Sequence, residues 1–521
     1  MQIDLLEWSI MERHKQDYQL SSESILKPVY RGVLVGLVVG GLVGVFRLLI
    51  EEIFTRVRTL YQQSHDNPRL LLMLIVTSLI VAVIVAVLIK SDPDIKGSGI
   101  PHVEGELKGL LHPNWWSVIW RKFIGGVLAI SSGLVLGREG PSIQLGAMAG
   151  KGLSELMKTG RTEQRVLIAS GAAAGLSAAF NAPIAGLLFV VEEVYHHFSR
   201  MVWITALVAS LVANFISLNI FGLKPVLAMP ENVSFLGLHQ YWIYLLLGLF
   251  LGILGYVYEK VVLNMGKFYA FLGKICHLSA PFYVVLAMIF LFPIGYFFPQ
   301  LLGGGNSLIV SLPSSSIGLW TALLYLVIRF VWSMLSYGSG VPGGIFLPIL
   351  ALGALSGMVF GLGMVELHLM TRHFLPLFVI LGMAGYFGAV SKAPLTAMIL
   401  VTEMVGDLRQ LMALGTVTLV AYLVMDLLKG EPIYEAMLER MAPKHDTSVV
   451  EPTLIELTVS EKVAGKCVKD LELPKNVLIT TQLHTGEAEV VSGDTILQAG
   501  DTIFLVVNEP EIGVVRAYFM S

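Results

Sequence analysis

A charged pair stands between two long apolar stretches of the chain, at a depth where a membrane helix normally carries no charge. Arg138 and Glu139 are neighbours inside the segment Gly137-Arg138-Glu139-Gly140-Pro141. An ionisable side chain in such a place is costly, and it marks an ion or proton pathway. Because a carboxyl group can take up and release a proton, we expect Glu139 to carry protons.

The segment around Glu139 has a counterpart later in the chain. A second Gly-x-x-x-Pro, Gly344-Ile345-Phe346-Leu347-Pro348, begins 207 positions after Gly137 (344 − 137). The step Asn181-Ala182-Pro183 returns as Lys392-Ala393-Pro394, 211 positions on (394 − 183). Two half-chains therefore carry one pattern, and we expect the Ala-Pro steps to break an apolar helix in each half.

Comparison of the halves separates two kinds of acidic residue. Glu192 is matched by Glu403, so we expect both to cap or tie helix ends. Glu139 and Glu193 fall opposite apolar residues of the other half. An acidic residue inside a membrane whose counterpart in the other half is apolar is not explained by the shared scaffold. Proton transport is the function that best explains it.

Glycine-rich segments mark further sites. Gly97-Ser98-Gly99-Ile100-Pro101 and Gly343-Gly344-Ile345-Phe346 have the composition of helix starts, since Gly permits close backbone approach and Pro fits the first turn. A helix that begins inside the membrane presents free amides and a positive dipole end, which bind an anion without a full positive charge. A lone glycine motif is more often a helix-packing feature. Several at the repeat offset favour an anion site.

Composition identifies a polytopic all-α membrane protein. The 521 residues are 55% hydrophobic and 14% charged, and the mean hydropathy is +0.73. Lipid bilayer is therefore the expected surrounding. The predicted spans are Val33–Ile50, Leu70–Ile89, Val118–Leu136, Trp203–Phe221, Trp242–Val261, Val284–Phe298, Thr321–Leu335 and Leu411–Leu428, with the interrupted runs Val166–Val191 and Leu377–Thr402.

Charge and cysteine content exclude other classes. The net charge of −3 gives no indication of nucleic-acid binding, and balanced Lys and Arg around the first span do not orient the chain. The first 28 residues are polar without an apolar core, unlike a cleaved signal peptide. The two cysteines, Cys276 and Cys467, are far apart, so we expect no disulfide framework, no metal site and no cofactor.

The composition changes after Leu428. Lys429–Arg440 has the pattern of an amphipathic helix, and residues 442–452 that of a polar linker. Beyond the linker, residues 453–521 are expected to form a small α+β domain. Its predicted strands are Thr453–Val459, Val477–Leu483, Glu487–Val491 and Thr502–Val507.

The glycine motifs, in this order and together with Tyr434 of Pro432-Ile433-Tyr434, resemble the CLC family of anion channels and proton-coupled anion exchangers. The resemblance implies an antiparallel repeat of broken transmembrane helices over residues 29–441, with halves at about 30–222 and 240–430. It also implies a cytosolic segment 1–28, both termini in the cytoplasm, a homodimer, and a bacterial cell membrane as the location. The spans Ile204–Phe221 and Thr416–Leu427, with Ala209 and Leu419, look like the family's dimer interface.

The same resemblance assigns roles to residues. Chloride would be contacted by the hydroxyls of Ser98 and Tyr434 and by the amides of Ile345 and Phe346. Glu139 would be the gate that occupies an anion site or swings away when protonated. Family exchangers carry an inner proton-transferring acid at the position of Glu193, so its presence favours exchange of chloride for protons over a passive channel. His102, where many members have Glu, is a departure from the family pattern.

The tail resembles the C-terminal ligand-binding module of regulator-of-potassium-conductance proteins, the TrkA-C domain. This implies a cytosolic regulatory site for an unknown small ligand. A potassium channel would need a Thr-Val-Gly-Tyr-Gly-like filter, which the sequence lacks.

Two local interpretations concern charged residues. The spacing Glu193-x-x-His196 fits a ligand pair of a di-iron enzyme. Such a site needs a second Glu-x-x-His, and the other half of the chain has none, so we expect no enzyme. Lys122 is expected to form a buried ion pair with Glu104.

Overall fold

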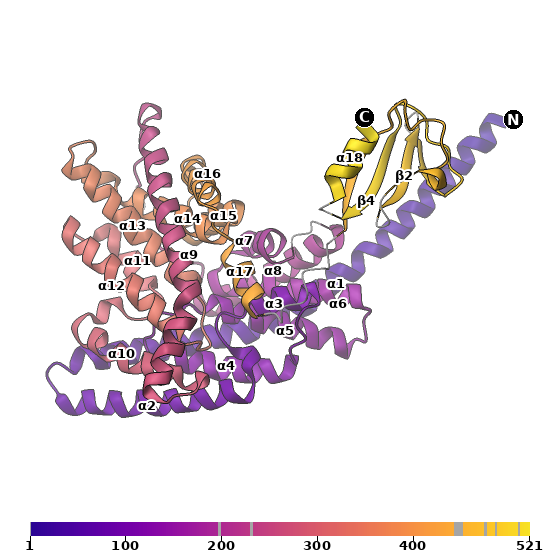
Figure 1. The fold of residues 1–521 in the computed structure, drawn as a ribbon. Coiled ribbons are helices and arrows are strands. Elements are labelled where there is room, and N and C mark those ends of the chain that lie inside the picture. Colours follow the sequence, from indigo (N-terminus) through magenta and orange to yellow (C-terminus); the bar gives the residue numbers. More distant parts are fainter. Residues whose placement is uncertain are drawn as a thin grey trace. The chain divides into compact units, whose positions relative to one another are not determined.

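The computed structural model describes residues 2–195, 199–229, 233–441, 452–471, 473, 477–484, 487–508 and 511–520, with most side chains from Leu26 onward. Two units emerge, residues 1–441 and residues 442–521. The helices of the first unit are α1 (Gln2–Gln63), α2 (Pro68–Ser91), α3 (Ile100–Lys108), α4 (Trp115–Ser131), α5 (Glu139–Leu156), α6 (Arg161–Phe180), α7 (Pro183–Phe189), the π-helical η2 (Val190–Val194), α8 (Arg200–Phe221), α9 (Trp242–Cys276), α10 (Tyr283–Phe297), α11 (Asn306–Ser311), α12 (Leu319–Gly338), α13 (Phe346–Glu366), α14 (Leu375–Ser391), α15 (Pro394–Val405), α16 (Leu411–Leu427) and α17 (Ile433–Met441) (Figure 1).

Nine helices in the described part of the chain are long and apolar enough to cross a membrane. Every predicted span falls on a helix, and the two interrupted runs are broken at Pro183 and Pro394 as expected. One boundary is wrong. The predicted span Val118–Leu136 overshoots α4, which ends at Ser131 because Gly133 takes a positive φ of 103° that a helix cannot continue through.

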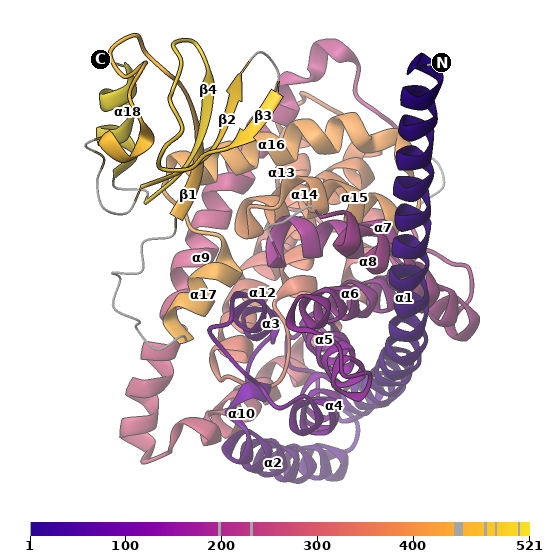
Figure 2. The same ribbon diagram turned by 90° about the vertical axis from the view of Figure 1, so that its right-hand side faces the viewer.

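The two halves repeat the same helix packing. Helix α5 packs against α6, and α13 packs against α14 in the same manner (Figure 2). In the first pair a Cβ on Gly146 would collide with the carbonyl of Gly171, and in the second a Cβ on Gly353 would collide with that of Gly382. These glycines are 207 and 211 positions apart (353 − 146 and 382 − 171). The repeat in the sequence is therefore a repeat of close backbone contacts between paired helices.

Helices α1 and α8 approach each other just as closely. A Cβ on Gly36 of α1 would be 2.7 Å from the carbonyl oxygen of Ala209 on α8, and the Ala209 side chain is fully buried. The expectation that Ala209 faces a second subunit is therefore wrong, because α1 of the same chain covers it. Leu419 on α16 is 53% exposed.

The second unit is a four-stranded antiparallel sheet with one helix. The strands β1 (Pro452–Thr458), β2 (Leu478–His484), β3 (Glu487–Val490) and β4 (Thr502–Asn508) follow the order β1-β4-β2-β3, and α18 (Ile512–Met520) completes the unit. Alternate residues of β4, from Ile503 to Val507, are buried with Phe519 of α18. The predicted strands agree within one residue at each end. Most of the predicted linker, residues 442–451, lies outside the described residues.

Candidate functional site

The two Gly-x-x-x-Pro motifs meet face to face. Gly137 N donates to Gly344 O and Gly344 N donates to Gly137 O, both at 2.7 Å. Helix α5 begins two residues after Gly137 and α13 begins two residues after Gly344. The first turns of one helix from each half therefore lie together, with backbone amides that no preceding turn can satisfy.

A third helix start, that of α3, joins this pair. Gly97 N donates to Gly340 O at 3.3 Å, and Gly343 N donates to Gly97 O at 3.0 Å. Ser98 lies directly against α5, since a Cβ on Gly140 would be 2.9 Å from the Ser98 Cβ. The predicted site residue Ser98 is thus held beside the start of the helix that carries Glu139.

Lys122 supports this turn and does not pair with Glu104. Its ammonium group is fully buried and donates to Ile95 O at 2.9 Å and to Gly97 O at 2.7 Å. Glu104 pairs instead with Lys108 at 2.9 Å. The predicted Lys122–Glu104 ion pair is therefore wrong, because the cation reaches the carbonyls that precede α3 before it reaches any carboxylate.

Tyr434 reaches the same region from the start of α17. Its ring lies 6.2 Å, edge to face, from that of Phe189, and the Phe189 ring is 5.8 Å from Phe346. Phe180 and Phe387, from equivalent helices of the two halves, pack on Phe346 at 5.3 and 4.3 Å. The Tyr434 hydroxyl is buried and has no hydrogen-bond partner within the described chain. Since a buried hydroxyl is normally paired, this donor is free for a ligand.

Glu139 occupies the junction of the helix starts. The side chain is fully buried, and its carboxylate lies beside the backbone amide of Leu347 and next to Gly137. Arg138 Nε is 3.9 Å from Glu139 Oε1. A carboxylate at this junction has the position and charge that a bound anion would have.

Glu193 is a second buried acidic residue, on a different helix from Glu139. It belongs to η2, one turn after Phe189, and is 5% exposed. A π-helical turn often marks a functional position. Helix η2 packs against α3, where Lys108 bridges Glu104 at 2.9 Å and Glu435 of α17 at 3.0 Å. His196, the second half of the di-iron spacing, lies outside the described residues.

Glu192 and Glu403 cap each other's helices across the repeat, as the sequence predicted. Glu403 accepts hydrogen bonds from Ile184 N at 3.1 Å and Ala185 N at 2.8 Å, at the start of α7. Glu192 accepts from Leu395 N at 3.1 Å and Thr396 N at 2.7 Å, at the start of α15. The two broken helices are thus tied reciprocally.

Removal of one cap should destabilise the protein. We expect Glu403→Ala to lower stability by roughly 1–3 kcal/mol, because two amides at a helix start lose a charged acceptor. Thermal unfolding in detergent, followed by size-exclusion chromatography, measures the effect. Glu366→Ala is the matched control, since Glu366 is exposed at the end of α13. Equal unfolding midpoints for the two variants would contradict the capping role.

Two cavities approach the site from different sides. One, of about 510 Å³, is lined by the far end of α1 and includes Arg138 and Leu347. The other, of about 390 Å³, includes Ser98, His102 and Met441, the last residue of the first unit. The first cavity therefore borders Arg138 and Leu347, which adjoin Glu139, and the second borders Ser98.

Sequence reasoning missed one charged group of the site. Glu51 Oε1 accepts from Arg138 Nη1 at 2.5 Å and from Arg47 Nε at 3.1 Å. The available signal was the i, i+4 spacing of Arg47 and Glu51 inside an apolar span. In the part of the chain that the structure describes, no group of three His, Cys, Asp or Glu side chains could hold a metal ion.

Comparison with known proteins supports the sequence resemblance. The Voltage gated chloride channel family matches residues 79–426, and the TrkA-C domain matches residues 453–520. The H(+)/Cl(-) exchange transporter ClcA of Vibrio parahaemolyticus is 35% identical over 418 residues, covering 77% of this chain and 87% of the relative. ClcA of Salmonella newport is 34% identical over 426 residues, covering 80% and 89%.

Solved structures agree with these matches. A slow cyanobacterial Cl-/H+ antiporter superimposes with a TM-score of 0.73 at 30% identity, covering 80% of this chain and 99% of that chain. A eukaryotic CLC transporter shares the fold, with a TM-score of 0.67 at 19% identity over 82% and 78% of the two chains. Each of these structures thus matches about four fifths of this chain.

Proposed function

The chain belongs to the voltage gated chloride channel family, and from this premise we propose that it is an antiporter that exchanges chloride for protons across a membrane. The observation that carries the proposal is the Glu139 carboxylate, which lies at the meeting point of helix starts beside the Leu347 amide. A titratable group in the position of an anion can make anion and proton movement depend on each other.

Chloride binds between the neutral donors of the site. The hydroxyls of Ser98 and Tyr434 and the amides of Ile345 and Phe346 provide hydrogen bonds and the positive ends of helix dipoles. Because none of these groups carries a full charge, the ion is held and also released. The unpartnered, buried hydroxyl of Tyr434 supports this assignment.

Glu139 acts as the gate. In its ionised form the carboxylate competes with chloride for the free amides at the start of α13. Protonation removes its charge and with it the attraction to those amides, so that chloride takes the vacated position. One proton taken up is therefore linked to the passage of anions, and Arg138, 3.9 Å away, limits how far the carboxylate moves.

Glu193 passes protons between Glu139 and the cytoplasmic side. It is buried one helical turn from Phe189, whose ring contacts those of Tyr434 and Phe346. Its equivalent in the other half is the fully buried Met404. Because an apolar residue serves at the equivalent position, the fold alone does not require an acidic residue at position 193. A second proton carrier favours an exchanger over a passive channel.

Reconstitution in liposomes tests this function. A chloride gradient imposed across the membrane should drive protons against their own gradient, recorded with an external pH electrode. A passive channel of this family, the alternative function, would dissipate the chloride gradient without moving protons.

The free hydroxyl of Tyr434 supplies a separate prediction. Tyr434→Phe should weaken chloride binding about tenfold or more, because a hydrogen bond to a charged group contributes roughly 1.5–3 kcal/mol. Titration calorimetry measures the affinity. Tyr269→Phe is the control, since it removes a buried hydroxyl that donates to Leu335 O at 2.5 Å. Unchanged chloride affinity in Tyr434→Phe would remove Tyr434 from the anion site.

Further features of the family are part of the proposal. The protein forms a homodimer, with the exposed Phe215, Leu419 and Leu423 of α8 and α16 as candidate interface residues in place of Ala209. It resides in a bacterial cell membrane with both termini in the cytoplasm, which makes the cavity at Arg138 the outer one. The second unit serves as a cytosolic regulatory domain for a small ligand.

A further inference from the structure

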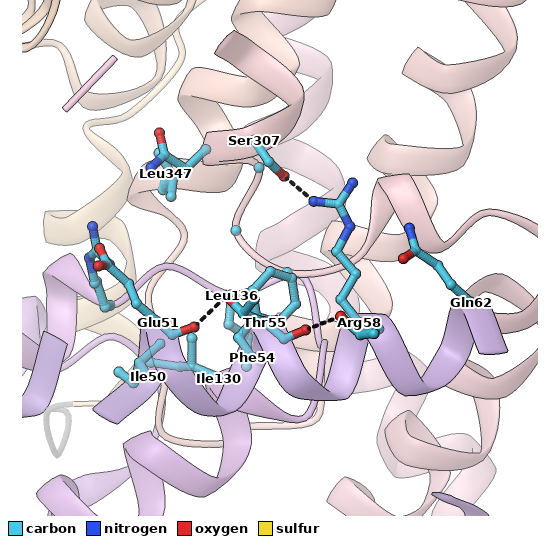
Figure 3. A pocket seen from close by; sticks show the side chains of 16 residues that line it. Ile50, Glu51, Phe54, Thr55, Arg58, Gln62, Ile130, Leu136, Ser307 and Leu347 are labelled. Atoms are coloured by element: carbon cyan, nitrogen blue, oxygen red, sulfur yellow. Dashed lines mark hydrogen bonds and ion pairs between the residues drawn. The ribbon is translucent and has the colours of Figure 1, made fainter. Parts of the chain in front are cut away.

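The outer cavity is walled by groups suited to an anion. Its volume is about 510 Å³, and its charged lining consists of Arg58, Arg138 and Glu51. Figure 3 shows Arg58 reaching from α1 across to Ser307, to which its Nη1 donates at 3.0 Å. Residues 303–307 form one wall of the cavity. The buried Arg329 donates to the carbonyls of Leu301, Gly303 and Gly304 in and next to this segment. Cations therefore outnumber the single lining carboxylate.

The room in the cavity suits a hydrated ion. A single water molecule needs only about 10–15 Å³ of such space, so the cavity accommodates several water molecules. A chloride ion can therefore approach Arg138 without losing its whole hydration shell. The cavity is separate from the Glu139 carboxylate, because Glu139 is fully buried and is not one of the residues that line the cavity.

Glu51 holds the guanidinium that an incoming anion would need. Its Oε1 accepts from Arg138 Nη1 at 2.5 Å, and Arg138 is 3.9 Å from Glu139. The Glu51 side chain is 40% exposed, whereas that of Arg138 is 7% exposed. Of this pair, Glu51 is the member that can move, and its departure would free Arg138 Nη1 to bind an anion.

Arg47 gives Glu51 a second partner when Arg138 is released. Its Nε donates to Glu51 Oε1 at 3.1 Å, and its Nη1 donates to Asn181 Oδ1, also at 3.1 Å. The guanidinium also lies 3.9 Å from the centre of the Phe221 ring. Because these contacts fix Arg47, Glu51 can leave Arg138 and remain paired.

We propose that the outer cavity is a halide-docking site in which chloride displaces Glu51 from Arg138, so that Glu51 sets the apparent affinity for chloride on this side. Glu51 is a competing ligand of Arg138 and carries no protons. The inference rests on the proposed transport function, since it concerns how chloride reaches Glu139.

Glu51→Gln tests the competition directly. The variant should lower the apparent KM for chloride on the outer side about two- to fivefold, the range expected for a half-exposed ion pair, with the proton-to-chloride ratio unchanged. Glu52→Gln is the matched control, because Glu52 makes the same charge change one residue away and pairs with the exposed Arg56 at 2.6 Å. Arg58→Gln should change KM in the opposite direction.

Two results would overturn the inference. Equal KM values for Glu51→Gln and Glu52→Gln would show that Glu51 does not compete with chloride, and a lower proton-to-chloride ratio in Glu51→Gln would make it a proton carrier. Anomalous diffraction from bromide-soaked Glu51→Gln crystals gives an independent test, with a bromide peak expected next to Arg138 and its absence contradicting the docking site. If the wild-type protein transported no chloride, the proposed function would fail while the bromide experiment still reported on docking.

Discussion

Replacing Glu139 with Gln will abolish proton transport while chloride transport continues. The amide keeps the size of the carboxyl group but has no charge, so it reproduces the protonated gate and cannot compete with chloride for the amide of Leu347. We expect proton flux to fall to the level of protein-free liposomes under a chloride gradient. Simultaneous recording of chloride and proton fluxes in the same liposomes measures both effects.

The control for this variant is Glu366→Gln. Glu366 is an exposed acid at the end of α13, and its substitution should leave both fluxes at the wild-type values. Proton transport that persists in Glu139→Gln at the wild-type ratio would contradict the assignment of Glu139 as the gate. Loss of both fluxes in a correctly folded variant would instead limit Glu139 to a structural role.

Glu193→Gln should produce the same uncoupling by a different route. The side chain keeps its volume and hydrogen-bonding capacity but no longer titrates, so protons lose their passage between Glu139 and the cytoplasm. Chloride transport should continue, because Glu193 is buried in η2 and the proposed chloride donors lie at the starts of α3, α13 and α17. Proton flux should again fall to the background of empty liposomes.

The adjacent acid supplies the matched comparison. Glu192 is bound to the amides of Leu395 and Thr396, so Glu192→Gln should lower thermal stability and leave the coupling intact. Proton pumping by Glu193→Gln against the proton gradient would exclude Glu193 from the proton route. Equal uncoupling in both variants would point to a general disturbance of η2.

Much of the membrane fold could be predicted from local patterns. The offset between Gly137 and Gly344 predicted a repeat, and the structure joins these two residues by a pair of backbone hydrogen bonds. The matched acids Glu192 and Glu403 predicted reciprocal caps, because a residue conserved between halves of a repeat performs the same task in each. Helix positions followed from apolar runs of about 20 residues.

The contacts between distant helices could not be predicted in this way. Lys122 and Ala209 were both misassigned, because the sequence does not show which carbonyls or which helix face each side chain meets. The spacing of Arg47 and Glu51 places them on one face of α1, but only the approach of α5 brings Arg138 within 2.5 Å of Glu51. Such contacts arise from tertiary packing.

The proposed anion site could not be assembled from sequence spacing either. Ser98 and Tyr434 are 336 positions apart (434 − 98), and the aromatic chain from Tyr434 through Phe189 to Phe346 depends on helices broken inside the membrane. Helix starts with free amides could be recognised from Gly and Pro. Their convergence followed from the family resemblance and not from spacing.

The most direct test of proton-coupled exchange is the membrane potential at which net chloride flux through the wild-type protein is zero. In liposomes with a fixed chloride gradient, a potassium ionophore sets the potential while the pH difference is varied. If the protein exchanges chloride for protons, the zero-flux potential changes with the pH difference, since each cycle moves protons in the direction opposite to chloride. A zero-flux potential that stays at the chloride equilibrium value at every pH difference would contradict this exchange and identify a passive channel.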